Sequence, residues 1–254
     1  RADGYLPCLT YERAQEVVAF HKHWLGGYSD SGQSVRTIVE QAASIPGTSS
    51  DELWVVAKRY INGGTVRYIE YLSHWDAHVE KEDGIFCDSA ITYSGSAATI
   101  ITGLWHLIGQ TVTVLADGAV IADKTVSATG TITLSTAAAK VHVGLPYTST
   151  LETLDIEAGA VQGTAQGKQK RIHNVTLRVD RSLGGSVGSS STKLDPLIFN
   201  DAAEAATTSA ELFTGDISVP MPSGWEASAS TYISHAVPLP FTVIAIMPEM
   251  TATG

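Results

Sequence analysis

The chain has 254 residues and a formal net charge of −10, and 44% of its residues are hydrophobic while 17% are charged. This apolar fraction excludes global disorder and is sufficient for one large core or two or three smaller ones. The acidic balance excludes a protein that grips nucleic acid over most of its surface, because phosphate binding needs clustered Lys and Arg.

Residues 9–25 are compatible with either a helix or strands. Glu12, Arg13 and Gln15 would suit a helix, whereas residues 17–24 have the apolar and alternating character of a strand. We favour a pair of strands. A loop rich in Gly, Ser and Asp follows.

Beyond this loop the sequence pattern predicts a strand at residues 34–45. It also predicts a β-hairpin at residues 51–71 that turns at Asn62-Gly63-Gly64. Asn and Gly tolerate the positive φ of a tight turn. Neither face of the hairpin is cleanly polar, so we expect it to be covered on both sides. Together with residues 9–25 these strands resemble one propeller blade.

Residues 74–84 are polar and acidic and predict a linker or a helical turn. Beyond them the pattern predicts five short strands, with a second hairpin turn at Ala116-Asp117-Gly118. The strands are residues 98–101, 111–115, 119–122, 130–134 and 140–143. Such a series is typical of a small barrel or sandwich.

The last third predicts strands at residues 151–156 and 172–179, a flexible Gly/Ser loop at 182–191, and an apolar strand at 239–248 that should be central and buried. The sequence therefore predicts an all-β fold: a propeller-blade-like antiparallel segment (1–86), a small β-barrel or sandwich module (87–146) and a C-terminal β-rich domain (147–254).

Histidine pairs are the first candidates for chemistry. On a strand His21 and His23 would project from one face, and on a helix His74 and His78 would do so. Either pair could hold a metal if a carboxylate joined, but neither forms the metalloprotease signature. We expect no metal site.

Carboxylates are the second candidates, because glycoside hydrolysis needs two of them around one bond. Glu80, Glu82, Asp83 and Asp88 cluster in sequence, but such a charge run is usually a solvated linker. The sequence contains no Gly-x-Ser-x-Gly or phosphate-cradling loop. We therefore expect a protein that is not an enzyme and uses no cofactor.

The two cysteines, Cys8 and Cys87, show no metal-ligand spacing; reduced thiols are favoured, and a disulfide stays open. No run of about 18 apolar residues and no secretion signal occurs, so we expect no membrane insertion. Because the chain opens at Arg1 rather than Met, a fragment or a processed form is expected.

Five of the 16 basic residues lie within fourteen positions around the predicted strand 172–179, and they gather at its two ends. This basic border consists of Lys168, Lys170, Arg171, Arg178 and Arg181. It is a candidate interface for phosphate or for an acidic neighbouring subunit, and a solubilising strand border is the alternative.

Several stretches in order resemble the C-terminal part of a phage and prophage family, the tail hub or nozzle proteins of short-tailed phages, also called packaged-DNA stabilisation proteins. The stretches include LTYERAQEVVAFHKHWLGG, IPGTSSDELWVVAKRYINGGTVRYIEYL, GLWHLIGQTVTVLADGAV, GKQKRIHNVTLRVDRSLG and PLPFTVIAIMPEM.

The resemblance implies a virion protein that assembles in the host cytoplasm into a homo-oligomeric ring, expected to be sixfold, around the channel through which the genome leaves. Its partners would be other tail, adaptor and fibre proteins and, in transit, genomic DNA. It implies no catalytic residues. The competing hypothesis is a carbohydrate-binding or carbohydrate-cleaving β-module, which predicts a concave site with exposed Trp or Tyr near paired carboxylates.

Overall fold

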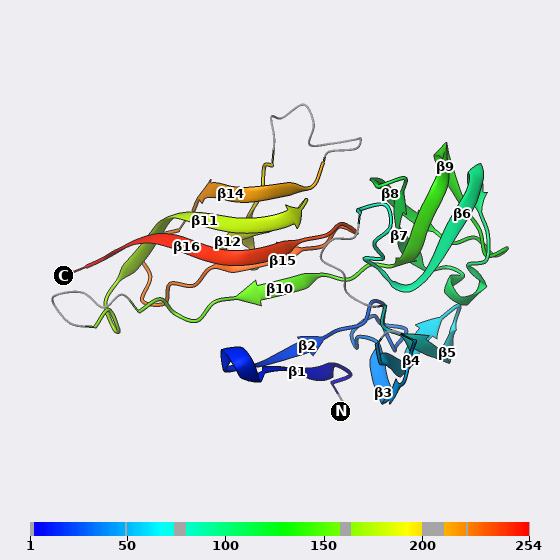
Figure 1. Cartoon of the computed structure of the whole chain (residues 1–254), viewed down its shortest axis with the longest axis horizontal. Helices are drawn as coiled ribbons and strands as arrows, with labels where there is room; N and C mark the ends of the chain where they lie inside the picture. Colours follow the sequence, from blue (N-terminus) through cyan, green and yellow to red (C-terminus); the bar gives the residue numbers. More distant parts are fainter. Residues whose placement is uncertain are drawn as a thin grey trace. The chain divides into compact units, whose positions relative to one another are not determined.

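A computed structural model describes residues 3–48, 50–73, 80–157, 164–199, 211–221 and 223–253 (Figure 1). The predicted all-β fold is confirmed, with 59% strand and 3% helical residues, and no sheet in the described ranges closes into a barrel. No helix there is both long and apolar enough to cross a membrane. The chain divides into two compact units, residues 1–76 with 85–147 and residues 77–84 with 148–254.

The first unit begins with two separate antiparallel sheets. The first is a two-stranded arm of β1 (Leu6–Glu12) and β2 (Val17–His23), joined by a short 3-10 helix, Arg13–Gln15. The second contains β3 (Ile38–Ile45), β4 (Glu52–Ile61) and β5 (Gly64–Tyr71). The strands that resembled one blade are thus divided between two sheets.

The hairpin of β4 and β5 forms at the predicted turn. Asn62 and Gly63 have φ of 48° and 80°, which is the left-handed region that a two-residue hairpin turn requires. Val55, Ala57, Arg59 and Ile61 alternate inward and are buried, while their neighbours on β4 are only half-buried. One face of this sheet therefore packs on the interior of the unit.

The other sheet of the first unit has the order β6-β9-β7-β8. Its strands are β6 (Asp88–Ile101), β7 (Thr111–Ala116), β8 (Ala119–Thr125) and β9 (Ile132–Leu145). The two predicted strands 130–134 and 140–143 lie largely within the single strand β9, because the Ser-Thr-Ala-Ala-Ala stretch between them contains no Gly, Pro, Asn or Asp. The second predicted hairpin turn is confirmed at Asp117-Gly118.

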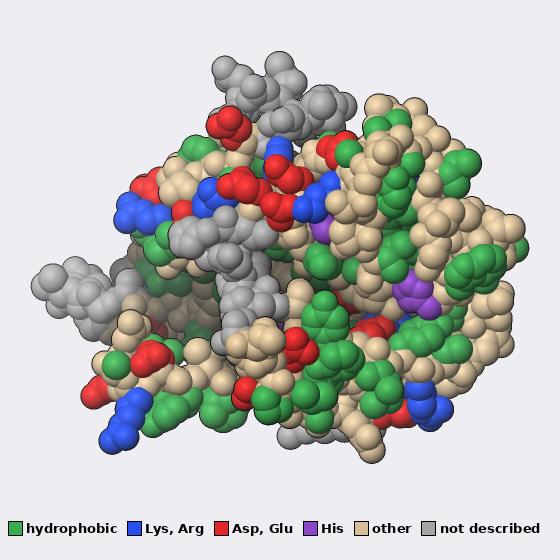
Figure 2. Space-filling view, turned by 45° about the vertical axis from the view of Figure 1, so that its right-hand side comes forward, with side chains coloured by type: hydrophobic (Ala, Val, Ile, Leu, Met, Phe, Trp, Pro, Cys, Tyr) green, Lys and Arg blue, Asp and Glu red, His purple; other side chains and the backbone are tan. Residues whose placement is uncertain are grey.

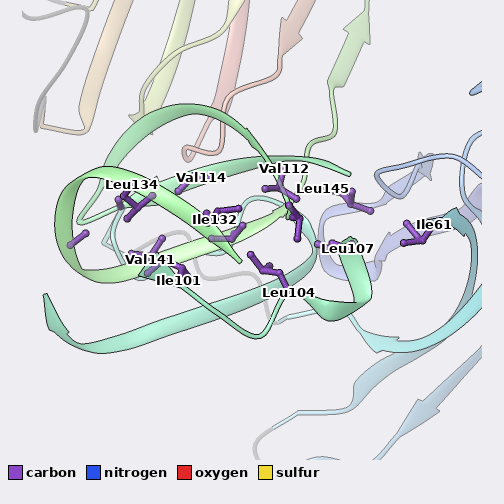
Figure 3. Close-up of a cluster of buried hydrophobic side chains, with 14 residues drawn as sticks. Ile61, Ile101, Leu104, Leu107, Val112, Val114, Ile132, Leu134, Val141 and Leu145 are labelled. Atoms are coloured by element: carbon purple, nitrogen blue, oxygen red, sulfur yellow. The ribbon is translucent and has the colours of Figure 1, made fainter. Parts of the chain in front are cut away.

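This sheet folds over the largest buried cluster of the first unit. Figure 3 shows Ile101, Val112, Val114, Ile132 and Val141 pointing toward one another between the strands. The turn with the 3-10 helix Trp105–Leu107 contributes two further buried side chains, Leu104 and Leu107. Ile61 of β4 joins the same cluster, so the β3–β5 sheet and the β6–β9 sheet share one core.

The second unit contains two antiparallel sheets around one core. One sheet has the order β14-β11-β16, with β11 (Lys170–Ser182) between β14 (Phe213–Pro220) and β16 (Thr242–Ala252). The other has the order β10-β15-β12-β13, made of β10 (Ser149–Glu152), β12 (Ser186–Ser190), β13 (Lys193–Pro196) and β15 (Tyr232–His235).

Two predictions for this unit were wrong. The apolar strand near the end, β16, lies at a sheet edge and is only partly buried, because β11 takes the central position. The predicted flexible loop 182–191 contains β12 instead. Val187 is fully buried there, and Gly188 lets β13 approach so closely that an added Cβ would lie 1.7 Å from the carbonyl oxygen of Lys193.

Candidate assembly surface

The arm of β1 and β2 exposes an apolar face. In the register of the two strands Leu9 lies opposite Phe20 and Tyr11 lies opposite Val18, so the four side chains share one face. Their exposed fractions are 51%, 82%, 65% and 59%. We call these four residues the arm face. Clustered large apolar side chains exposed to this degree are typical of an interaction site.

Within the described chain the arm packs on the rest of its unit through its base. Leu6 packs against the buried cluster of Leu25, Val39, Val55 and Ala57, whereas both strands are exposed toward the tip. At the tip the carboxylate of Glu12 accepts a 3.0 Å hydrogen bond from the Ala14 backbone N–H. A two-stranded hairpin by itself is only marginally stable in water. Toward its tip the arm therefore has little packing to stabilise it within the described chain.

A second apolar surface lies on β4 and β5. Trp54 pairs with Tyr71 and Val56 pairs with Ile69 across the two strands, and the rings of Trp54 and Tyr71 lie 5.3 Å apart. Ile69 is 74% exposed and Tyr71 is 56% exposed. The expectation that this hairpin is covered on both sides is wrong for this face within the described chain. Green hydrophobic side chains are visible in the lower part of Figure 2, at the height where Figure 1 places β1–β5.

The opposite face of the arm combines three potential metal ligands. The donor atoms of Cys8, His21 and His23 all lie within 4.8 Å of one another. Burial raises the pKa of the Cys8 thiol, and burial together with the nearby His21 lowers the pKa of His23. The sequence pattern showed the two histidines but not the cysteine, which joins them only through the strand register. The other histidine pair, His74 and His78, lies outside the described residues.

Lys170 and Arg178 of the basic border lie on opposite faces of β11. The predicted alternation placed Ile172 and Arg178 on one face, but the pairing of β11 with β16 shifts between Ile172 and Asn174. After this bulge the buried residues are Val175, Leu177 and Val179. A bulge adds one residue to one strand and so exchanges the two faces beyond it.

Three of the five basic residues are also buried or ion-paired within their own unit. Lys170 is 2% exposed. Arg178 forms a two-pronged ion pair with Asp216 at 2.7 and 2.8 Å, and Arg181 contacts Glu80 at 3.1 Å. Lys168 is half-buried and Arg171 is exposed. The exposed positive charge that the sequence suggested is thus confined to a small part of the basic border.

Two carboxylates of the predicted cluster, Glu80 and Asp88, belong to different units, and each has a partner within its own unit. Glu80 contacts Arg181, and Asp88 is a buried residue whose Oδ2 accepts a 2.5 Å hydrogen bond from the Gly26 N–H. Burial is the main cause that raises the pKa of Asp88 to about 6. Each of these carboxylates therefore has a structural contact of its own.

A depression of about 770 Å³ in the second unit is lined by three other carboxylates, Glu152, Asp155 and Glu157, together with Lys170. Each of the three accepts a hydrogen bond from a Ser or Thr hydroxyl, such as Ser228 to Asp155 at 2.5 Å. Its described lining contains no Trp or Tyr, which the carbohydrate hypothesis requires.

A smaller depression of about 230 Å³ in the first unit does contain Tyr28 and Tyr60. Its described lining has one carboxylate, Asp30, which accepts hydrogen bonds from the Val35 and Ser34 backbone N–H groups and from the Ser34 hydroxyl. These bonds lower the pKa of Asp30. The carboxylate stabilises its own loop and has no second carboxylate for glycoside hydrolysis within that lining.

Neither the protein-family models nor the curated proteins contain a match to this chain.

Proposed function

We propose that the chain is a structural subunit that assembles with further copies of itself. The assembly is proposed to be the tail nozzle or hub ring of a short-tailed phage, which lines or closes the DNA exit channel. The arm face carries this proposal, because Leu9, Tyr11, Val18 and Phe20 expose more than half of their area at the end of a hairpin.

A second copy is the partner that fits the arm best. The arm sheet contains β1 and β2 alone, so in the described chain the outer edge of each strand has no neighbouring strand. An exposed strand edge can pair with a strand of another subunit through main-chain hydrogen bonds. The apolar face would then be buried against the neighbouring copy, whose open face on β4 and β5 is also apolar.

The charge of the chain supports a channel through which DNA passes. With a net charge of −10, a ring of these subunits would repel DNA and so avoid trapping it. The order of the stretches that resemble the nozzle family points to the same role. Tail, adaptor and fibre proteins would be the further partners.

Sedimentation velocity of the purified chain tests self-assembly. We expect the wild-type protein to form a species whose mass is a whole-number multiple of 26.8 kDa, and negative-stain images to show a closed ring. The double variant Leu9→Ser with Phe20→Ser should shift the population to the monomer, because it removes the apolar contact and leaves the exposed strands soluble.

The matched control is Leu154→Ser. Leu154 is 90% exposed, lies in the second unit and does not belong to the arm. This control should keep the wild-type mass. A wild-type chain that stays monomeric at every concentration would contradict the proposal, and so would a double variant that assembles as well as the control.

A further inference from the structure

Three side chains that can ligate a metal meet on the side of the arm opposite the arm face. Cys8 lies directly opposite His21, and Leu6 lies opposite His23, so Cys8 and the two histidines share one side of the hairpin. Lys22, between the histidines in sequence, belongs to the other side, and its Nζ lies 4.9 Å from the centre of the Tyr5 ring. A cation is therefore not placed among the three donors.

The geometry points to a transition-metal site, and we propose that Cys8, His21 and His23 bind one zinc-class divalent ion. The three donor atoms lie within 4.8 Å of one another. Tetrahedral zinc with bonds of about 2.0–2.3 Å needs donors about 3.3–3.7 Å apart. His21 and His23 both retain exposed area, so rotation about their side-chain bonds can close this difference without moving the strands.

The donor set selects the class of metal. One thiolate and two imidazoles suit Zn²⁺, Co²⁺ or Cu²⁺, whereas Mg²⁺ and Ca²⁺ prefer oxygen ligands. Binding takes the thiolate form of Cys8, so one proton leaves to solvent for each ion bound. Three protein ligands leave one coordination position for water.

The ion would stabilise the arm. Because Cys8 belongs to β1 and both histidines belong to β2, the metal cross-links the two strands in the half of the hairpin nearest its base. A ligand that binds the paired strands and not the separated ones shifts the equilibrium toward the pair. The site goes beyond the proposed assembly, since it can form in the monomer.

Titration of the full-length chain with Co²⁺ alone tests the site. We expect saturation at one equivalent with a sulfur-to-cobalt charge-transfer band, and displacement of cobalt by Zn²⁺. The band should disappear in Cys8→Ser, and His21→Asn or His23→Asn should weaken binding by about tenfold or more. The control His173→Asn, which changes an exposed histidine of β11, should bind as the wild type does.

Limited trypsin digestion gives a second readout. Arg13 lies at the exposed tip of the arm, and Zn²⁺ should slow cleavage there in the wild type but not in Cys8→Ser. Circular dichroism of each variant verifies that it is folded. The proposal is overturned if the folded wild type shows no sulfur-to-cobalt band, or if Cys8→Ser binds cobalt with unchanged affinity. Because each measurement can be made on the monomer, its failure is distinct from a failure of assembly.

Discussion

Arg59 and Glu70 form a two-pronged ion pair between β4 and β5 in which the guanidinium has no exposed area and the carboxylate is 18% exposed. Arg59 Nε also donates a 3.1 Å hydrogen bond to the carbonyl oxygen of Gly26, and Glu70 accepts one from the Ser89 hydroxyl at 2.8 Å. The pair thus connects the β3–β5 sheet with the loop after the arm and with the start of β6.

Replacing Arg59 by Met should destabilise the first unit strongly. The substitution leaves the Glu70 carboxylate without its counter-charge and removes the donor to Gly26. Removal of one partner from a buried ion pair costs about 3–5 kcal/mol. Urea unfolding followed by circular dichroism measures this loss.

Arg67→Met is the matched control for that measurement. Arg67 pairs with Glu40, but its side chain is 56% exposed, and an exposed pair contributes about 0–1 kcal/mol. Equal losses of stability in the two variants would contradict the structural role assigned to Arg59.

Asp88 should make the protein less stable as the pH rises. Burial raises its pKa from 3.8 to about 6, although the Gly26 N–H and Arg59 oppose this shift. The folded state therefore binds the Asp88 proton more tightly than the unfolded chain does. The cost of ionisation is absent below about pH 4 and complete above about pH 6, and it amounts to roughly 2–3 kcal/mol.

Asp88→Asn isolates this contribution, because the amide oxygen can still accept the Gly26 hydrogen bond while carrying no charge. Unfolding free energies of both proteins at pH 5 and pH 8 give the test. We expect the variant to gain stability relative to the wild type on going from pH 5 to pH 8. Subtracting the unfolding free energy of the wild type from that of the variant at each pH cancels the titration of all other groups. The prediction is contradicted if this difference in free energy is the same at pH 5 and pH 8.

The two hairpins could be predicted because their signals are local. Asn62-Gly63 and Asp117-Gly118 supply the positive φ at the turn itself, and β-branched residues flank both turns. The inward position of Arg59 was also visible in principle, because it alternates with Val55, Ala57 and Ile61. The identity of its partner, Glu70, was not visible, since it depends on which face of the sheet is covered.

Long-range register explains what the sequence pattern missed. Cys8 meets His21 only because a four-residue connection, residues 13–16, sets the pairing of β1 with β2. The bulge near His173 exchanges the faces of β11, and no residue type in this strand marks that position. The apolar composition of β16 suggested a central strand. The position of a strand in a sheet depends on which strands pair with it, and here β11 pairs with both β14 and β16.

Gly188→Ala should destabilise the second unit. An added Cβ would lie 1.7 Å from the Lys193 carbonyl oxygen, so β12 and β13 would have to separate. Overpacking of this kind costs about 1–3 kcal/mol or more. Gly224→Ala is the control, because no atom lies within 4 Å of its added Cβ. Thermal unfolding should show a lower midpoint for Gly188→Ala alone, and equal midpoints would contradict the close approach.

The basic border should contribute little to assembly, in contrast to the arm face. Arg178 and Arg181 are paired with Asp216 and Glu80, which leaves Arg171 as the exposed residue whose charge can be reversed without breaking a described ion pair. We expect Arg171→Glu to keep the wild-type mass in sedimentation velocity, because an exposed charge is mainly solvated. A fall to the monomer in this variant would instead place the border in a subunit interface.

Lys170→Glu must be judged separately, because its effect should be on folding. Lys170 is 2% exposed and lines the same depression as Glu152, Asp155 and Glu157, so reversal of its charge adds a fourth carboxylate to that site. Like charges without a counter-charge in a partly buried site repel one another, and we expect a loss of about 2 kcal/mol or more. Urea unfolding measures this loss, and a wild-type midpoint in Lys170→Glu would contradict the buried position of the lysine.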